Sequence, residues 1–252
     1  MSSRLIFLII FRLKNKVFSA TIQDSMVLIL PSITTSGNSD WRQMINECDS
    51  LGITEVALFL TCLSAFKRQE AYEALKQSSI KSIPFVHLRS DMSPEEVKYL
   101  MDNYGTEMFN IHSQKQFPLK HDLSQFRPLI YLENADYPIA DEIGEWAGLC
   151  LDVSHQENKR LMNLPLYDEV ARILETHPVG CWHLNAIKPQ AVFKGEEIGL
   201  GHDLHSFENL SEFDYCVSYK DYLPRFIALE LENSLAEQLK AKDYVAKLLG
   251  IR

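Results

Sequence analysis

The sequence predicts an α/β protein folded as a single (β/α)8 TIM barrel over residues 26–252. Eight short β-rich runs alternate with helical stretches along this part of the chain, and such alternation is typical of parallel strands joined by right-handed crossovers. Eight units in roughly 225 residues fit a closed barrel, a fold that usually takes about 250 residues. A dinucleotide-binding sheet would need a Gly-rich loop after its first strand, and residues 30–35 contain no glycine.

The expected elements follow from composition and periodicity. Strands are expected at residues 27–33, 55–60, 82–88, 108–111, 129–133, 149–153, 179–184 and 226–231. Helices are expected at residues 41–51, 66–77, 93–105, 166–176 and 233–249. The clearest helix start lies at Ser93, an N-cap that is followed by Pro94 in the first turn and Glu96 at the capping-box position. Gly105 then ends this helix.

Composition and charge describe a chain that buries a core and does not favour nucleic acid. With 46% hydrophobic and 23% charged residues, disordered and collagen-like classes are excluded. Lys and Arg number 25 against 34 Asp and Glu, a formal charge of -9. Nucleic acid attracts basic surfaces, so a chain with this acidic charge is not expected to bind it, although a local basic patch stays possible. We therefore expect a small phosphorylated or sugar substrate. The sequence leaves the oligomeric state open.

The N-terminal segment, residues 1–25, is expected to lie outside the barrel. Its apolar run at residues 5–11 is too short to cross a bilayer, and the basic residues after the run are the wrong flank for a signal peptide. The segment is either an N-terminal extension or a mis-assigned start, and translation beginning at Met26, just before the first expected strand, explains it equally well. The five cysteines form no C-x-x-C pair, which favours a reducing compartment. We therefore expect a cytoplasmic protein without membrane contact.

Ionisable residues stand at the end of almost every expected strand. In a barrel these ends meet at one mouth, so the side chains can share a site. They are His87, His112, Glu133, Asp152, His155, His183 and Glu230, with Asp203 and His205 in the loop after the seventh strand. Charges beside apolar strands are costly to desolvate unless they are paired or bind a cation, and matching Lys or Arg residues are not expected there. The ring predicts an open, catalytic divalent-metal site, with zinc expected first and manganese or cobalt as alternatives.

Each of these residues also has an ordinary structural interpretation. A lone His87 or His112 at a strand end is most often a hydrogen-bonded rim residue. Ordinary structural roles would have to explain polar residues at five strand ends independently. One shared metal site explains all five together and is therefore favoured. Glu230 and Glu232 lie two residues apart and point to the same side of their strand; we expect Glu230 to bind metal and Glu232 to cap the mouth. Cys62 is expected to line the site.

Four short motifs together resemble a known superfamily. They are Leu-Glu-Asn-Ala-Asp at 132–136, Leu-Asp-Val-Ser-His at 151–155, Trp-His-Leu-Asn at 182–185 and Leu-Glu-Leu-Glu-Asn at 229–233. Their order resembles the xylose-isomerase-like barrels, which join sugar and sugar-phosphate isomerases and epimerases to the apurinic endonucleases of the endonuclease IV type. The resemblance covers nearly the whole chain from Met26. It implies a metal-dependent barrel enzyme and leaves two reactions open.

The endonuclease branch resembles the chain further, because His87, His112 and the segment 203–205 stand where that branch adds ligands. This resemblance implies a three-metal cluster and hydrolysis of a phosphoester by a hydroxide held between the first two ions. The first ion would be held by His87, His112 and Glu133, the second by Glu133, Asp152, His183 and Glu230, and the third by His155, Asp203 and His205. We favour this function, an endonuclease IV-like phosphoester hydrolase.

The alternative is a sugar or sugar-phosphate isomerase or epimerase. The resemblance to that branch implies one divalent ion held by Glu133, Asp152, His183 and Glu230. Glu133 and Glu230 would be the catalytic residues that exchange a proton as acid and base. His155 would bind substrate, and His87 and His112 would be rim residues. The residues expected to bind substrate are Asn134, Asn185, Lys188 and Glu232.

Some features depart from the endonuclease pattern. The stretch between His87 and His112 is short and leaves little room for a loop that grips DNA, and Ser-Phe-Glu-Asn at 206–209 replaces an expected Gly-rich run. Lys67 and Arg68 form the one basic pair placed for phosphate contact, but a solvated first helical turn is the more frequent explanation of such a pair. A degenerate barrel that binds a ligand without turnover is a third possibility.

Overall fold

The structure, a computed structural model, describes residues 26–37, 39–196 and 199–251. The expected extension, residues 1–25, lies outside the described residues. The strands are β1 (Leu28–Leu30), β2 (Ser32–Thr34), β3 (Glu55–Phe59), β4 (Ser82–His87), β5 (Met108–Ile111), β6 (Ile130–Glu133), β7 (Leu149–Asp152), β8 (Val179–Leu184), β9 (Ala186–Phe193), β10 (Leu200–Leu204) and β11 (Phe226–Leu229). The α-helices are α2 (Trp41–Leu51), α3 (Ala65–Gln77), α4 (Pro94–Tyr104), α5 (Val153–Leu161), α6 (Leu166–Leu174) and α7 (Leu235–Leu249). The 3-10 helices are η1 (Ser124–Leu129), η2 (Ile143–Glu145) and η3 (Leu210–Tyr222).

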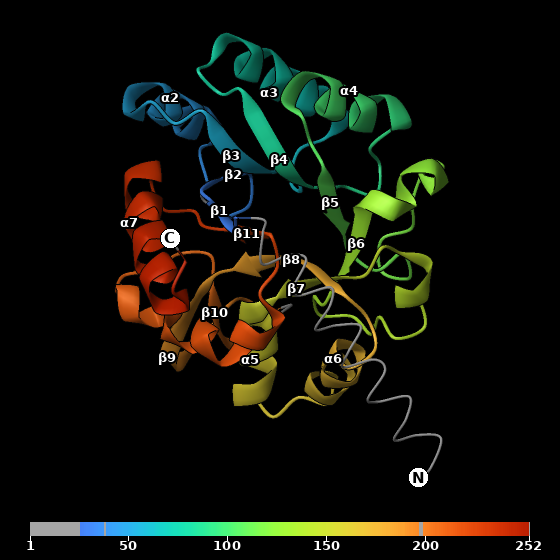
Figure 1. Ribbon diagram of the computed structural model, residues 1–252, viewed down its shortest axis with the longest axis vertical. Coiled ribbons are helices and arrows are strands. Elements are labelled where there is room, and N and C mark those ends of the chain that lie inside the picture. Colours follow the sequence, from blue (N-terminus) through green and yellow to red (C-terminus); the bar gives the residue numbers. More distant parts are fainter. Residues whose placement is uncertain (1–25, 38, 197–198, 252) are drawn as a thin grey trace.

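Nine parallel strands form one nearly closed, barrel-shaped sheet (Figure 1). Their order is β1-β11-β8-β7-β6-β5-β4-β3-β2. At one end of this order β1 pairs with β11, and at the other end β2 pairs with β3. Since only Pro31 separates β1 from β2 in the chain, the two ends of the sheet meet. The predicted α/β class with a parallel, barrel-shaped sheet is confirmed.

The first expected strand, residues 27–33, consists of two segments. Pro31 lies between them and has no backbone N–H to donate to a neighbouring strand. Its carbonyl oxygen still accepts a hydrogen bond from the backbone N–H of Ala57 at 2.9 Å. The proline therefore interrupts the strand without opening the sheet, and the sheet has nine strands where the sequence predicts eight.

The five helices that the sequence predicts are present as α2, α3, α4, α6 and α7, each within two residues of its expected bounds. They lie around the outside of the sheet in Figure 1. The capping box of α4 is confirmed, because the Ser93 hydroxyl accepts from the backbone N–H of Glu96 and the Glu96 carboxylate accepts from the backbone N–H of Ser93. The connections after β5 and β6 contain only the 3-10 helices η1 and η2, so strands and α-helices do not alternate throughout.

Helix α5, the β9–β10 hairpin and the 3-10 helices η1, η2 and η3 are not among the elements that the sequence predicts. Helix α5 begins directly after β7 because the Asp152 carboxylate caps it, accepting from the backbone N–H of His155 at 2.7 Å. β9 and β10 pair antiparallel, with an irregular register between Gly201 and Asp203. The spacing Asp-x-x-His, interpreted from the sequence as a pair of metal ligands in preference to a capping Asp beside a surface His, thus also marks the start of a helix.

Alternating strand residues fill two separate regions of the core. In β3, Ala57 and Phe59 belong to a small cluster made of strand residues, whereas Val56 and Leu58 belong to a large cluster that includes helix residues. This period of two is the geometry of a strand whose two faces are both covered. The small cluster fills the inside of the barrel, and the large cluster lies between the sheet and the helices.

Arg68 differs from both of its expected roles. Its guanidinium is fully buried and forms hydrogen bonds to both carboxylate oxygens of Glu96, at 2.8 and 2.9 Å, and to Asp91 at 2.9 Å. It therefore neither contacts a phosphate nor sits in solvent, because α4 and the loop before it supply its counter-charges. Lys67 is exposed.

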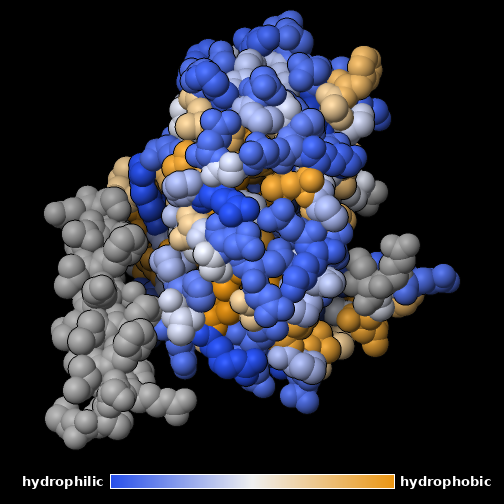
Figure 2. Space-filling view, turned by 90° about the vertical axis from the view of Figure 1, so that its right-hand side faces the viewer, coloured by the Kyte–Doolittle hydropathy of each residue, from blue (hydrophilic) through white to orange (hydrophobic). Residues whose placement is uncertain are grey.

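None of the described helices is both long and apolar enough to cross a bilayer. On the face of the molecule shown in Figure 2, hydrophilic residues predominate and hydrophobic residues form small separate groups.

Candidate metal centre

Polar side chains from five strands converge where those strands end. His87, Glu133 and Asp152 are the last residues of β4, β6 and β7, His183 lies one residue before the end of β8, and Glu230 directly follows β11. All five are buried. Parallel strands bring their carboxyl ends to one edge of the sheet. Residues that are far apart in the sequence therefore share one site.

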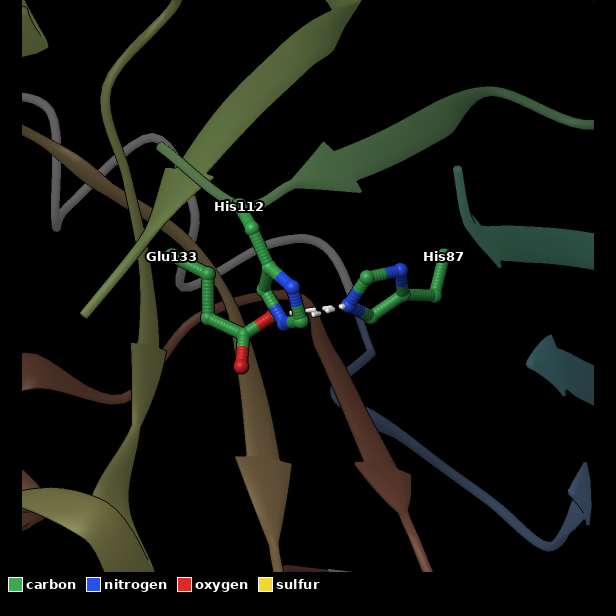
Figure 3. Close-up of side chains that lie close together, drawn as sticks. All are labelled: His87, His112 and Glu133. Atoms are coloured by element: carbon green, nitrogen blue, oxygen red, sulfur yellow. Dashed lines mark hydrogen bonds and ion pairs between the residues drawn. The ribbon is translucent and has the colours of Figure 1, made fainter. Parts of the chain in front are cut away.

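The first cluster consists of His87, His112 and Glu133. The Nε2 atom of His87 lies 2.9 Å from Oε2 of Glu133, and Nε2 of His112 lies 3.5 Å from the same oxygen. The two Nε2 atoms are 3.2 Å apart. Figure 3 shows both imidazoles directed toward the carboxylate. These three atoms lie close enough together to hold one metal ion.

The second ring nitrogen of His87 determines which form of the imidazole faces this cluster. Nδ1 of His87 lies 2.9 Å from the carbonyl oxygen of Leu88, which can only accept, so Nδ1 carries the proton. Burial lowers the pKa of His87 below its ordinary value, which favours the neutral ring. Nε2 then turns a lone pair toward the Glu133 carboxylate. Two electron-rich atoms at this distance suit a cation between them, and a histidine oriented by a carbonyl is the usual form of a metal ligand.

The second cluster consists of Glu133, Asp152, His183 and Glu230. Nδ1 of His183 lies 3.5 Å from Oε2 of Glu133, 3.5 Å from Oε2 of Glu230 and 4.0 Å from Oδ2 of Asp152. Three carboxylates thus surround one imidazole nitrogen. Asp152, His183 and Glu230 form a group that could hold a metal ion.

His183 shows that these residues fit a cation. Its side chain is fully buried, and within the described part of the chain neither ring nitrogen has a hydrogen-bond partner. An unsatisfied buried polar group costs about 1–3 kcal/mol. Burial disfavours the charged ring, but the carboxylates of Glu133, Glu230 and Asp152 outweigh it and raise the pKa of His183 to about 9. The site therefore favours a positive charge at this position.

Glu133 belongs to both clusters through a single oxygen. Its Oε2 faces His87 and His112 on one side and His183 on the other. Burial alone would raise the pKa of Glu133, but His183 and His112 hold it well below its ordinary value. Asn110 donates to the same oxygen at 2.7 Å. Asn110 is not among the site residues predicted from the sequence, although an amide within the apolar run of β5 is a signal of such a role.

Asp152 is fixed from several directions. Its Oδ1 accepts from the hydroxyl of Ser154 at 2.6 Å and from the backbone N–H of His155 at 2.7 Å, so Oδ2 is the oxygen that faces His183. Asn134 clamps the backbone of Asp152: its amide oxygen accepts from the Asp152 N–H at 2.6 Å, and its amide nitrogen donates to the Asp152 carbonyl at 3.0 Å. Asn134 was expected to contact substrate. In the structure both ends of the Asn134 amide bond to the Asp152 backbone, so Asn134 positions Asp152.

The third ligand set that the resemblance implies is only partly brought together. Nδ1 of His155 lies 2.8 Å from Oδ2 of Asp203, and Nζ of Lys194 lies 2.9 Å from Oδ1 of Asp203. His205 lines the cavity. Among the described residues, neither Asp203 nor His205 belongs to a group that could hold an ion. The expectation that the ring has no matching Lys or Arg is wrong here, because Lys194, in the hairpin loop, reaches the site.

The other residues expected to bind substrate differ in their positions. Glu232 lines the cavity. Asn185 is fully buried behind the site, with its amide nitrogen 3.4 Å from Oδ2 of Asp152. Lys188 is not among the residues that line the cavity; its Nζ lies 2.9 Å from the Glu212 carboxylate. The β9–β10 hairpin causes this difference, because it directs Lys194 toward the site and Lys188 toward η3.

Cys150 is a neighbour of the site that the sequence analysis leaves out. Its sulfur lies within 4.8 Å of ligand atoms of Glu133 and His183. Burial raises the pKa of Cys150 well above its ordinary value, which favours the neutral thiol. Cys150 precedes Asp152 by two residues on β7, so both side chains are on the same face of the sheet. That spacing is the signal that could have found it.

The clusters open into a cavity of about 810 Å³. Its lining includes His87, His112, Glu133, His155, Asp203, His205, Glu230, Glu232, Arg89, Lys194, Cys62 and Phe117. Phe117 is exposed, and its ring centroid lies 5.5 Å from that of His112. Cys62 lines the cavity, as the sequence predicts. Candidate metal ligands, two cationic side chains and an aromatic ring therefore face the same cavity.

Comparison with known proteins adds no relative: no family model matches the chain, and no curated protein matches it significantly.

Proposed function

We propose that the chain is a divalent-metal-dependent phosphoester hydrolase of the (β/α)8 barrel type, similar to the endonuclease IV branch of the xylose-isomerase-like barrels. When β1 and β2 count as one strand interrupted at Pro31, the sheet has the eight strands of that fold. Zinc is the proposed metal, because sites built from imidazole and carboxylate ligands suit it.

The observation that carries the proposal is the position of Glu133 between two clusters. One oxygen of its carboxylate faces His87 and His112 as well as His183. A carboxylate placed in this way can bridge two ions. A one-ion isomerase needs no His87 or His112 at Glu133 and would leave them as polar rim residues, whereas His87 is buried against the carboxylate.

Two divalent ions at such a site supply Lewis-acid stabilisation of the charge on a phosphoryl group. The residues of the chain fix the geometry for this chemistry: Asn110 holds Glu133, and Asn134 holds the backbone of Asp152. Arg89 and Lys194 line the cavity and can attract an anionic substrate. A cavity of about 810 Å³ lies in the usual range for small ligands. With a net charge of -9, a small phosphate ester suits the chain better than duplex DNA does.

The proposal is tested by metal content and by hydrolysis of p-nitrophenyl phosphate and bis(p-nitrophenyl) phosphate. We expect at least two zinc ions per chain. His112→Ala should remove one ion and lower kcat at least about 100-fold, since it removes a ligand of a bridged pair. His121→Ala is the matched control, because His121 is exposed. A single ion per chain, or full hydrolysis by His112→Ala, would contradict the proposal.

A sugar or sugar-phosphate isomerase or epimerase is the second candidate. It is favoured by the second cluster, in which Glu133 and Glu230 lie at equal distances of 3.5 Å from Nδ1 of His183. One ion and a pair of carboxylates would suffice for proton exchange. In that case His112→Ala would retain most of the isomerase activity on a panel of aldoses, ketoses and their phosphates.

A further inference from the structure

Lys194 lies where the resemblance implies a third metal ion. Its Nζ is 2.9 Å from Oδ1 of Asp203, and the other oxygen of the same carboxylate is 2.8 Å from Nδ1 of His155. The Asp203 side chain is 1% exposed, and that of Lys194 is 15% exposed. Oδ1 of Asp203 therefore already faces a cationic partner, whereas Oδ2 of Asp203 and Nδ1 of His155 form no hydrogen bond among the described residues. Since neither Asp203 nor His205 belongs to a group of described residues that could hold an ion, the ammonium of Lys194 is the cation that lies beside Asp203.

The hairpin is shaped to bring Lys194 to this position. A Cβ atom on Gly201 would lie 3.0 Å from Cδ of Lys194 and 3.1 Å from Oδ1 of Asp203, so a side chain there would crowd the ion pair. The register irregularity between Gly201 and Asp203 redirects the strand at this point. Asn158 in α5 accepts from the backbone N–H of His202 at 2.8 Å and ties β10 to the barrel.

We propose that the ammonium group of Lys194 takes the place of a third metal ion, so that the centre binds two ions and Lys194 binds a phosphoryl oxygen of the substrate. This inference rests on the proposed hydrolase function. Lys194 lines the cavity, and among the described residues Asp203 is the one side chain paired with its Nζ. An ammonium has three protons to donate, so protons are left for a ligand.

The test uses the full-length chain loaded with zinc, with two measurements. The zinc content per chain is counted after removal of free metal, and inorganic phosphate is titrated into the loaded protein by calorimetry. We expect two zinc ions in the unmodified chain. Lys194→Met, which keeps an unbranched side chain of similar length but removes the ammonium group, should weaken phosphate binding at least about tenfold, the effect of losing one charge-assisted hydrogen bond. Lys194→Arg should stay within about threefold.

Lys188→Met is the matched control. Lys188 lies on the same hairpin and also forms an ion pair at 2.9 Å, but its partner is Glu212, outside the cavity lining. We expect this variant to bind two zinc ions and to bind phosphate like the unmodified chain. Asp203→Asn should also keep two zinc ions, because Asp203 is a partner of Lys194 rather than a metal ligand.

Three zinc ions in the unmodified chain, the loss of an ion in Asp203→Asn, or unchanged phosphate affinity in Lys194→Met would each overturn the inference and leave the hydrolase proposal standing. Fewer than two ions in the unmodified chain would instead contradict the proposed function, and the inference with it. If circular dichroism shows that Lys194→Met does not fold, the zinc counts of the unmodified chain and of Asp203→Asn decide.

Discussion

Nε2 of His87 lies 2.9 Å from Oε2 of Glu133, while Nδ1 of the same ring is held 2.9 Å from the Leu88 carbonyl. The carbonyl fixes the tautomer, and the tautomer turns a lone pair toward a buried carboxylate. This relationship identifies Glu133 as the centre of the site, because His183 faces the same oxygen from the second cluster. Residues that orient Glu133 should therefore control the metal affinity of both clusters.

Asn110 offers the clearest test of that control. It donates to Oε2 of Glu133 at 2.7 Å and is fully buried. We expect Asn110→Ala to lower the zinc affinity about 10- to 100-fold, the usual effect of removing a group that orients a metal ligand. Competition with a chromophoric chelator measures it. Asn103→Ala is the control, because among the described residues the Asn103 amide bonds to the Tyr99 carbonyl of its own helix, on an exposed face. Equal affinities in the two variants would contradict this role.

Arg68 should stabilise the fold without taking part in the chemistry. Arg68→Met leaves the carboxylates of Glu96 and Asp91 without their buried counter-charge, so we expect a loss of about 3 kcal/mol in the free energy of unfolding, measured in urea. Arg42→Met is the control: Arg42 pairs with Glu70 at the surface, with 59% and 40% of the two side chains exposed. Its loss should cost less than about 1 kcal/mol. Similar losses in both variants would show that burial of the Arg68 pair adds nothing.

The same ion pair predicts a pH dependence. Burial alone would raise the pKa of Glu96, but its hydrogen bonds from Arg68 outweigh burial and lower the pKa below the ordinary value of 4.5. A carboxyl with a lowered pKa in the folded state contributes stability above its unfolded-state value and loses that contribution as the pH falls through its folded-state value. We expect the stability advantage of the unmodified chain over Glu96→Gln to be constant near pH 6 and to shrink below about pH 4.5. A constant difference down to pH 3 would refute it.

Much of the fold could be predicted because local patterns decide it. The helix from Pro94 begins at a capping box that the sequence shows, and strands β3 to β8 are apolar runs with clear boundaries. The division of the first strand at Pro31 and the start of α5 at Asp152 are different. Pro31 lacks the backbone N–H that would continue the strand, yet its carbonyl still accepts from Ala57 on the neighbouring strand. Asp152 caps α5 through a local contact to His155, whereas the metal-ligand interpretation of the same spacing was favoured from the sequence.

The candidate site divides in the same way. Strand-end position picks out His87, Glu133, Asp152, His183 and Glu230, because parallel strands bring their ends to one edge. Strand-end position does not identify Asn110, because its amide donates to Glu133 only when β5 and β6 pair in the folded sheet. Strand-end position also does not show that both ends of the Asn134 amide bond to the backbone of Asp152.

The sequence by itself determined which chemical groups are available at the mouth of the barrel: imidazoles and carboxylates at the ends of apolar strands, where burial makes a bound cation favourable. Only the tertiary structure decided how they are shared. The β9–β10 hairpin, which was not predicted from the sequence, places Lys194 beside Asp203. One oxygen of Glu133 faces both clusters. The reason is physical: strand periodicity sets the direction of a side chain, but its partners at about 3 Å depend on elements that meet only when the barrel closes.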